Sequence, residues 1–265
     1  MPNNIHTFTD MMGREVSIPY PPQRIISLVP SQTELLYDLG LNEEVVGITK
    51  FCIHPNKWFR TKQRVGGTKN ANIALIKSLS PDLIIANKEE NTKEDIEELA
   101  KHFPVWISDI KSLDDSLIMI KEVGKIVAKP QQALTLADEI FHGFTNLKKS
   151  DTPRSVAYFI WRNPWMCAGG DTFINNMITA MGWKNVLADK DRYPQIDLNE
   201  LKDLQVDLVL LSSEPYPFKE AHINEIKSVL GDVESILVDG EYFSWYGSRL
   251  KGAVSYLAGL VAVYK

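Results

Sequence analysis

The sequence predicts an α/β protein made of two Rossmann-like lobes with mostly parallel sheets, bridged by one long rigid helix. Short β-branched runs alternate with amphipathic helical patterns, which is typical of parallel sheets covered by helices. This alternation stops near Asp114 and restarts at Ser155, and part of the first half repeats in the second. We therefore expect an N-terminal α/β lobe at 1–112, a helical linker at 113–150 and a C-terminal α/β lobe at 151–265.

The first lobe is expected to open with a hairpin. The segment from Phe8 to Ile18 contains the turn Asp10-Met11-Met12-Gly13 and ends at a cluster of prolines. The alternating elements that follow are a strand at 24–29, a helix at 32–39, a strand at 45–48, a helix at 73–79, a strand at 83–86, a helix at 95–102 and a strand at 105–108.

The linker carries no strand signal. Its apolar residues recur at the spacing of a helix face, at Ala133, Leu136, Ala137, Ile140, Phe141, Phe144 and Leu147. Because proline is tolerated in a first helical turn, a helix from Pro130 to Lys149 of about 20 residues would be roughly 30 Å long. We expect a rod that allows only a slight tilt between the lobes.

The second lobe resumes the alternation. Its expected elements are a strand at 155–160, helices at 172–181 and 199–204, a strand at 208–211, a helix at 219–230, a strand at 236–238 and a last helix from about 248. A shift of 125 positions lays Leu75–Asn91 over Glu200–Tyr216, and Glu89 then coincides with Glu214. Both glutamates follow a predicted parallel strand, where open α/β sheets bind ligands. Chance likeness between two helix-turn-strand units is the alternative.

Composition excludes several classes of protein. With 29 Lys+Arg against 34 Asp+Glu the formal charge is −5, which argues against a nucleic-acid partner. Two cysteines are too few for a disulfide scaffold or a structural zinc site. No apolar run approaches the roughly 18 to 20 residues of a membrane span, and the N-terminus resembles neither a secretory leader nor a lipid-attachment site.

Motifs for catalysis are missing, so we expect a protein that is not an enzyme and carries no cofactor. There is no nucleophile elbow, no zinc-protease motif, no phosphate-binding loop and no dinucleotide fingerprint. The doublets Gly66-Gly67 and Gly169-Gly170 are interpreted as tight loops. Because Gly169-Gly170-Asp171 precedes a predicted helix, that loop could alternatively hold an anion.

Aromatic residues in the loops after strands give the clearest indication of function. Prolines stiffen these loops, and rigid aromatics suit a large, flat, mostly apolar ligand with charged groups at its rim. Burial in the core is the alternative, and it is expected for Trp106 and Trp183. The candidate ligand-binding residues are Phe51, Trp58, Trp161, Arg162, Trp165, Tyr193, Glu214, Trp245, Tyr246 and Arg249.

One combination of residues could hold a metal. Cys52 and His54 follow one predicted strand, and Cys167 lies in a comparable loop of the second lobe. The three side chains could converge as a metal or cobalt site. A buried apolar cysteine and a turn histidine are the alternative, which we favour, so no metal site is expected.

The sequence resembles the extracytoplasmic solute-binding proteins of ABC importers for cobalamin, ferric siderophores and haem, also called helical-backbone metal receptors. The likeness covers nearly the whole chain. It rests on the opening 22–34 (PQRIISLVPSQTE), on Gly66-Gly67 followed by 81–85 (PDLII), and on Gly170, Phe173-Ile174 and 182–186 (GWKNV). Cobalamin-binding proteins are the nearest likeness.

The resemblance implies the class III periplasmic-binding-protein fold and an aromatic-lined cleft between the lobes for a metal chelate. It also implies an extracytoplasmic monomer whose acidic residues dock on a membrane ABC permease, with Glu90, Glu94, Asp95 and Glu220 as candidates. The lack of a leader in this chain suggests another possibility, a cytoplasmic relative that handles corrinoid or metal through Cys52, His54 and Cys167. An interaction module without a small ligand is a third.

Overall fold

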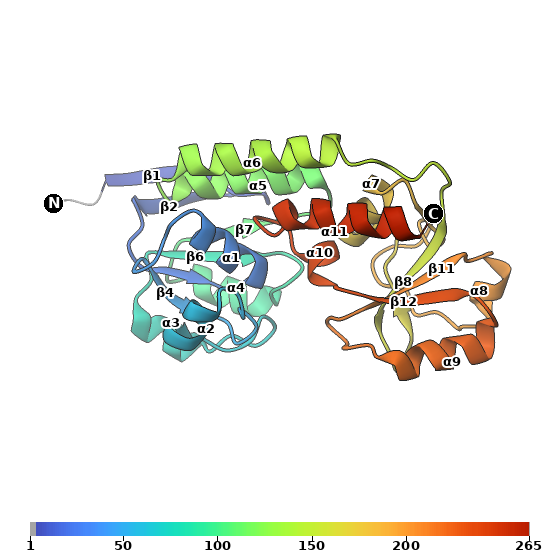
Figure 1. Cartoon of the computed structure of the whole chain (residues 1–265). Coiled ribbons are helices and arrows are strands. Elements are labelled where there is room, and N and C mark those ends of the chain that lie inside the picture. The colour runs from blue at the N-terminus through green and yellow to red at the C-terminus, as the bar shows by residue number, and fades with distance from the viewer. Residues whose placement is uncertain (1–3, 265) are drawn as a thin grey trace. The chain divides into compact units, whose positions relative to one another are not determined.

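The computed structural model describes residues 4–264, which form two compact units (Figure 1). The first unit runs to Ile110 and also contains Asp114–Glu139 and Tyr246–Arg249. The second unit contains Lys111–Leu113, Ile140–Trp245 and the chain from Leu250 onward. The segment expected as a linker is therefore shared between the two units.

The first unit is built on a five-stranded parallel sheet. Its order is β5-β4-β3-β6-β7, in which β3 is Ile25–Ser27, β4 Val45–Ile48, β5 Gln63–Arg64, β6 Leu83–Asn87 and β7 Val105–Ser108. Every residue of β3 and β6 is buried, as expected for strands covered on both faces. The connecting helices are α1 Pro30–Asp38, α2 Asn56–Thr61, α3 Ile73–Leu79 and α4 Lys93–Ala100.

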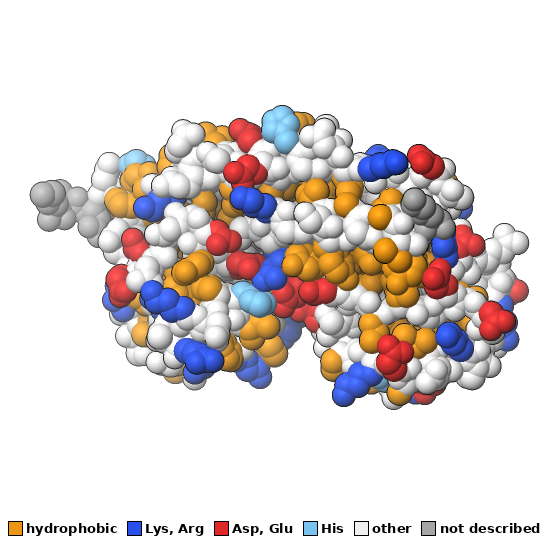
Figure 2. Space-filling model, in the orientation of Figure 1, with side chains coloured by type: hydrophobic (Ala, Val, Ile, Leu, Met, Phe, Trp, Pro, Cys, Tyr) orange, Lys and Arg blue, Asp and Glu red, His pale blue; other side chains and the backbone are white. Residues whose placement is uncertain are grey.

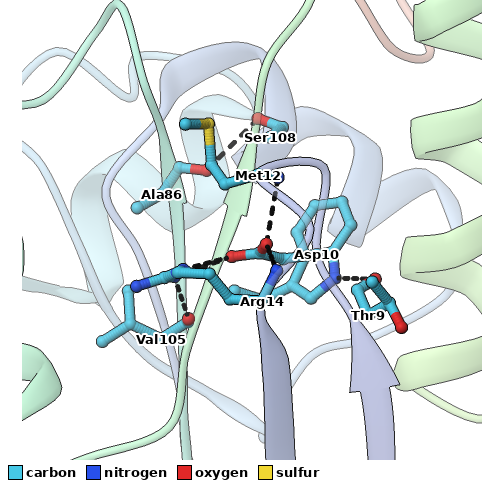
Figure 3. Close-up of polar contacts among 8 residues, drawn as sticks. Thr9, Asp10, Met12, Arg14, Ala86, Val105 and Ser108 are labelled. Carbon is cyan, nitrogen blue, oxygen red and sulfur yellow. Dashed lines mark hydrogen bonds and ion pairs between the residues drawn. The ribbon is translucent and has the colours of Figure 1, made fainter.

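The expected N-terminal hairpin is confirmed. Strands β1 (Asn4–Thr9) and β2 (Glu15–Tyr20) pair antiparallel, and the Asp10 carboxylate closes their turn by accepting the backbone N–H groups of Met12 and Arg14 (Figure 3). The Arg14 guanidinium donates to Asp10 Oδ2 and to the Val105 carbonyl of β7. The hairpin is thus fastened to the edge of the sheet.

The segment between the two alternating regions forms two helices. The second is the long helix expected from Pro130, which ends at Thr145 and not at Lys149, while the first had been given no bounds. Helix α5 is Leu113–Ile126 and helix α6 is Pro130–Thr145. The chain turns between them at Ala128, whose φ is 57°. The two helices lie side by side (Figure 1), because Gly124 leaves room for Ala133: a Cβ at Gly124 would be 2.1 Å from the Ala133 Cβ.

The second unit has a four-stranded parallel sheet in the order β10-β8-β11-β12, with β9 antiparallel to β8. The strands are β8 Ser155–Trp161, β9 Met166–Cys167, β10 Lys184–Asn185, β11 Leu208–Ser212 and β12 Glu234–Val238. Its helices are α7 Phe173–Ala180, α8 Glu200–Asp203, α9 Glu220–Leu230, α10 Glu241–Ser244 and α11 Leu250–Val263. The short elements β9, β10 and α10 had not been expected.

The internal repeat corresponds to the same arrangement in both units, in which an aspartate before a strand binds the backbone of a neighbouring strand segment. Strands β6 and β11 are related by the same shift of 125 residues. Just before β6, the Asp82 carboxylate accepts the N–H groups of Gln23 and Arg24, which lead into β3. Just before β11, the Asp207 carboxylate accepts the Ser155 N–H at the start of β8. Each aspartate therefore fixes the register of a neighbouring parallel strand.

The described surface carries charges of both signs. On the face shown in Figure 2, lysine and arginine side chains are scattered among acidic ones without forming a continuous basic area. Within residues 4–264, no helix is both long enough and apolar enough to cross a membrane.

Candidate functional site

Each sheet reverses its strand order once, and this defines where a ligand is expected. In the first unit β3 lies between β4 and β6, so the reversal falls between β3 and β6. In the second unit β8 lies between β10 and β11, so it falls between β8 and β11. Open α/β sheets bind ligands beyond the carboxyl ends of the strands at such a switch point. Glu89 and Glu214 follow β6 and β11 at these two places.

Aromatic side chains cluster at the switch point of the second unit. Trp161, at the end of β8, is 40% exposed and meets Tyr216, from the loop after β11, edge to face at 5.7 Å between ring centroids. Tyr216 also packs against Phe218, which stacks on Trp165 at 6.0 Å and 2°. Tyr216 and Phe218 are not among the predicted ligand-binding residues. The mutual packing makes the cluster a rigid apolar surface.

The tyrosine of this cluster is oriented by a histidine of α9. His222 Nδ1 accepts the Lys219 N–H at 2.9 Å, so the neutral imidazole carries its proton on Nε2. Nε2 lies 3.1 Å from the Tyr216 Oη and donates to it. The Tyr216 hydroxyl keeps its own proton available for an acceptor on a ligand.

Arg162, expected at the rim of the site, is held by an acid of the same unit. Its guanidinium lies over the Trp165 ring at 5.1 Å and binds both carboxylate oxygens of Glu225 on α9, with Nε 2.6 Å from Oε2. These hydrogen bonds raise the pKa of Arg162 and lower the pKa of Glu225. Arg162 therefore stays charged and is neutralised within the chain.

Glu214 supports other site residues. Its Oε1 accepts hydrogen bonds from Ser244 Oγ and Trp245 Nε1, both at 2.8 Å. Burial raises the pKa of this carboxyl, and the hydrogen bonds from Ser244 and Trp245 partly oppose that shift. The loop after β11 is thereby joined to the loop after β12.

A surface hollow of about 350 Å³ borders the cluster at Trp165. Its polar lining consists of three amides, Asn163, Gln195 and Asn199, and one carboxylate, Asp197. Among the described residues that line it, none is lysine or arginine. The volume is in the range of small-molecule sites.

In the first unit the exposed aromatic is Phe51, in the loop after β4. Its ring is 50% exposed, the neighbouring Ile53 is 43% exposed, and Lys50 Nζ lies 5.0 Å from the Phe51 centroid. The loop beneath is fixed by Cys52, whose Sγ is 3.1 Å from the hydroxyls of both Thr33 and Thr49. Phe51 is thus presented on a supported loop.

The residues that the sequence reasoning missed form a buried polar network under the switch point of the first unit. Asn91 Oδ1 accepts the Asn87 N–H at 2.9 Å, and its Nδ2 donates to the carbonyls of Leu28 and Thr68. Asn87 in turn donates to Ser108 Oγ. The network joins the loops after β3, β5 and β6 to the last residue of β7. Two asparagines four residues apart at a strand end were the signal available in the sequence.

Arg249, another predicted rim residue, is also neutralised internally. Its Nε and Nη2 donate to the two carboxylate oxygens of Glu34 at 2.9 and 2.7 Å. Burial raises the pKa of Glu34, while the charge and hydrogen bonds of Arg249 oppose that shift. Both side chains are less than one-fifth exposed, so the pair belongs to the frame of the first unit.

Three of the predicted ligand-binding aromatics are buried. Trp58 has no exposed surface: it lies in α2, packs edge to face on Tyr37 of α1 and donates to Asn42. Trp245 is 7% exposed and Tyr246 6%. Tyr193 is half-buried with Arg192 over its ring. The expectation that Trp58 lies in a loop was wrong because residues 56–61 form a helix.

The proposed metal cluster of Cys52, His54 and Cys167 does not form. Cys167 is fully buried in the apolar core of the second unit, and burial raises its pKa well above the usual value. Cys52 is buried in the first unit, and both cysteines are free. Among residues 4–264, no group of three His, Cys, Asp or Glu side chains is arranged to hold a metal. The alternative that depended on this cluster is therefore withdrawn.

The Gly169-Gly170 loop packs closely against the backbone of residues 188–192. Its two N–H groups donate to the carbonyls of Arg192 and Lys190 at 2.8 and 2.7 Å. A Cβ at either glycine would lie within 2.4 Å of a backbone carbonyl oxygen. The N–H groups that an anion would need are engaged, so the tight-loop interpretation is confirmed and the anion site is not.

The candidate docking acids differ in availability. Asp95 Oδ2 accepts the Ala71 N–H at 2.9 Å, so this carboxylate holds the loop before α3, and Glu90 is half-buried. Glu94 and Glu220 are exposed in the first turns of α4 and α9. Of the four, Glu94 and Glu220 are the more exposed.

Comparison with known proteins agrees with this architecture. Residues 25–230 match the family described as "Periplasmic binding protein". A vitamin B12-binding protein of Pectobacterium carotovorum is 26% identical over 236 residues, covering 86% of this chain and 84% of that protein. The uncharacterized ABC transporter substrate-binding lipoprotein YvrC of Bacillus subtilis is 29% identical, covering 77% and 68%.

Solved structures share the fold. The periplasmic heme-binding protein RhuT of Roseiflexus superposes with a TM-score of 0.79 at 22% identity, covering 90% of this chain and 97% of that one. The fold is that of the class III periplasmic binding proteins, as the sequence predicted. The names of these relatives describe binding proteins, and one of them is named as the substrate-binding lipoprotein of an ABC transporter. The family match covers about four-fifths of the chain, so the chain belongs to the periplasmic binding proteins.

Proposed function

We propose that the protein is an extracytoplasmic, monomeric receptor that binds a metal chelate, either a corrinoid or a ferric siderophore, and delivers it to a membrane ABC permease. The observation that carries the proposal is the exposed Trp161 packed on Tyr216 at a switch point. A rigid aromatic surface suits the flat apolar face of a chelate. The names of the vitamin B12-binding and ABC-transporter relatives support the same reading.

Replacing Trp161 by alanine should weaken chelate binding about 10- to 30-fold, because central aromatic anchors dominate binding energy. Cyanocobalamin and ferrioxamine B are the probes, titrated by calorimetry and by quenching of tryptophan fluorescence. Phe141→Ala is the matched control, because this side chain is 48% exposed but lies in helix α6 and not in a loop that follows a strand. The affinity of the Phe141→Ala protein for each probe should stay within about twofold of the wild-type value. If neither probe binds more tightly than about 100 μM, about −5.5 kcal/mol, the proposed function is wrong.

Delivery is proposed to depend on Glu94 and Glu220, which could pair with basic residues of the permease. Reversing both charges, by Glu94→Arg and Glu220→Arg, should leave cyanocobalamin affinity unchanged and reduce uptake of radiolabelled cyanocobalamin by cells about tenfold or more. Glu97→Arg, on the exposed side of α4, is the control and should transport normally. Normal uptake by the doubly reversed protein would exclude these acids as the docking residues.

A further inference from the structure

Two arginines predicted as ligand-binding residues, one in each unit, are neutralised by acids of their own unit. Arg162 binds both oxygens of Glu225, and Arg249 binds both oxygens of Glu34. In the loop after β6, Lys88 Nζ lies 2.5 Å from Asp109 Oδ2. Two of the three pairs are bidentate, which is the geometry of a strong charge-assisted interaction.

Recruiting these arginines to an anionic ligand would be costly. Glu34 is largely buried, and loss of Arg249 would leave its charge uncompensated, a situation that is strongly destabilising in proteins. Arg162 would have to leave both Glu225 and the face of Trp165. Neither guanidinium is therefore offered to a ligand carboxylate.

The segment that follows β12 in the second unit carries two acids, Asp239 and Glu241, whereas the loop after β11 carries Glu214 and the exposed Lys219. The hollow beside Trp165 adds the Asp197 carboxylate and, among its described lining residues, no cation. A ligand that brings further negative charge would meet repulsion there.

We propose that the aromatic site of the second unit selects an uncharged chelate and discriminates against an anionic one, because the ion pair with Glu225 withholds Arg162 from the ligand. This inference rests on the proposed function and narrows its ligand class. A neutral corrinoid fits such a site, whereas a chelate with free carboxylates, such as haem, does not.

The test compares two ligands of the same shape. Cyanocobalamin carries no net charge, and its monocarboxylic acid, made by hydrolysis of one side-chain amide, carries one negative charge. Wild-type protein should bind the acid about fivefold more weakly, which is about 1 kcal/mol. Equal affinity, or preference for the acid, would overturn the charge selection and leave the proposed function standing. If neither ligand binds, the proposed function itself fails.

Two matched variants test whether the Arg162–Glu225 pair causes the discrimination between the two ligands. Glu225→Gln removes the partner of Arg162 and should reduce the fivefold discrimination to about twofold or less. Glu234→Gln removes the acid paired with Arg154, where strands β12 and β8 of the same sheet begin. The side chains of this pair are about as exposed as those of Arg162 and Glu225. The variant should leave the discrimination at about fivefold. If both variants discriminate as wild type does, the Arg162–Glu225 pair is not the selecting element. Should Glu225→Gln fail to fold by circular dichroism, the wild-type comparison still decides the charge selection.

Discussion

Replacing Asn91 by alanine is expected to lower the free energy of unfolding by about 3 to 4 kcal/mol. The side chain is 7% exposed and makes three hydrogen bonds: it accepts the Asn87 N–H and donates to the carbonyls of Leu28 and Thr68. Alanine would leave these backbone groups without the partner, at about 1 to 3 kcal/mol for each one that stays buried. Urea unfolding followed by circular dichroism measures the loss.

Two further variants make this expectation specific. Asn91→Asp keeps the acceptor for Asn87 but loses the donor to Leu28 and Thr68, so its loss should be at least as large as that of a single buried hydrogen bond. Asn224→Ala, on the exposed face of α9, should change stability by less than about 0.5 kcal/mol. A loss below about 1 kcal/mol for Asn91→Ala would show that the carbonyls find other partners.

The Asn91 network also explains how the first unit can present a binding surface on loops. Loops are usually the more mobile parts of a fold, and binding is weakened when they must be ordered by the ligand. Here the Asn91 amide holds the loop after β3 to the loop after β5, and Asn87 donates a hydrogen bond to Ser108 at the end of β7. The strand-end loops are therefore ordered before any ligand arrives.

Much of the fold could be predicted from local sequence signals. Strands β4 and β7 and helix α3 have the expected bounds because continuous apolar runs and helical periodicity are local properties. Helix α5 was given no bounds because the helical periodicity was read only from Pro130 onward, although residues 113–126 carry a helical pattern of their own. Two-residue strands such as β9 and β10 leave no periodicity to detect.

The candidate site was less predictable, because its properties depend on distant partners. Arg162 and Glu225 are 63 residues apart in the sequence, and Arg249 and Glu34 are 215 apart. Nothing local to Arg162 indicates that it is already neutralised. Trp58 was misplaced for a similar reason: its burial depends on α1, whereas its neighbours in the sequence resemble a loop.

The second large effect is expected at Gly170. A Cβ added there would lie 2.0 Å from the carbonyl oxygen of Ala188 and 2.8 Å from its carbonyl carbon. Both atoms belong to the backbone, so the clash can be relieved only by moving the chain, which would also disturb the hydrogen bond from the Gly170 N–H to Lys190. Gly170→Ala should therefore cost about 3 kcal/mol or more.

Gly259 provides a control with the opposite sign. It is exposed within α11, and an added Cβ would meet nothing within 4 Å. Alanine at this position should stabilise the protein by about 0.5 to 1 kcal/mol, since it restricts the unfolded chain and favours the helix. Parallel urea titrations of the Gly170→Ala and Gly259→Ala proteins measure the two changes in the free energy of unfolding. A similar effect of the two substitutions would mean that the Gly169-Gly170 loop can yield, and that close backbone approach is not the reason for glycine there.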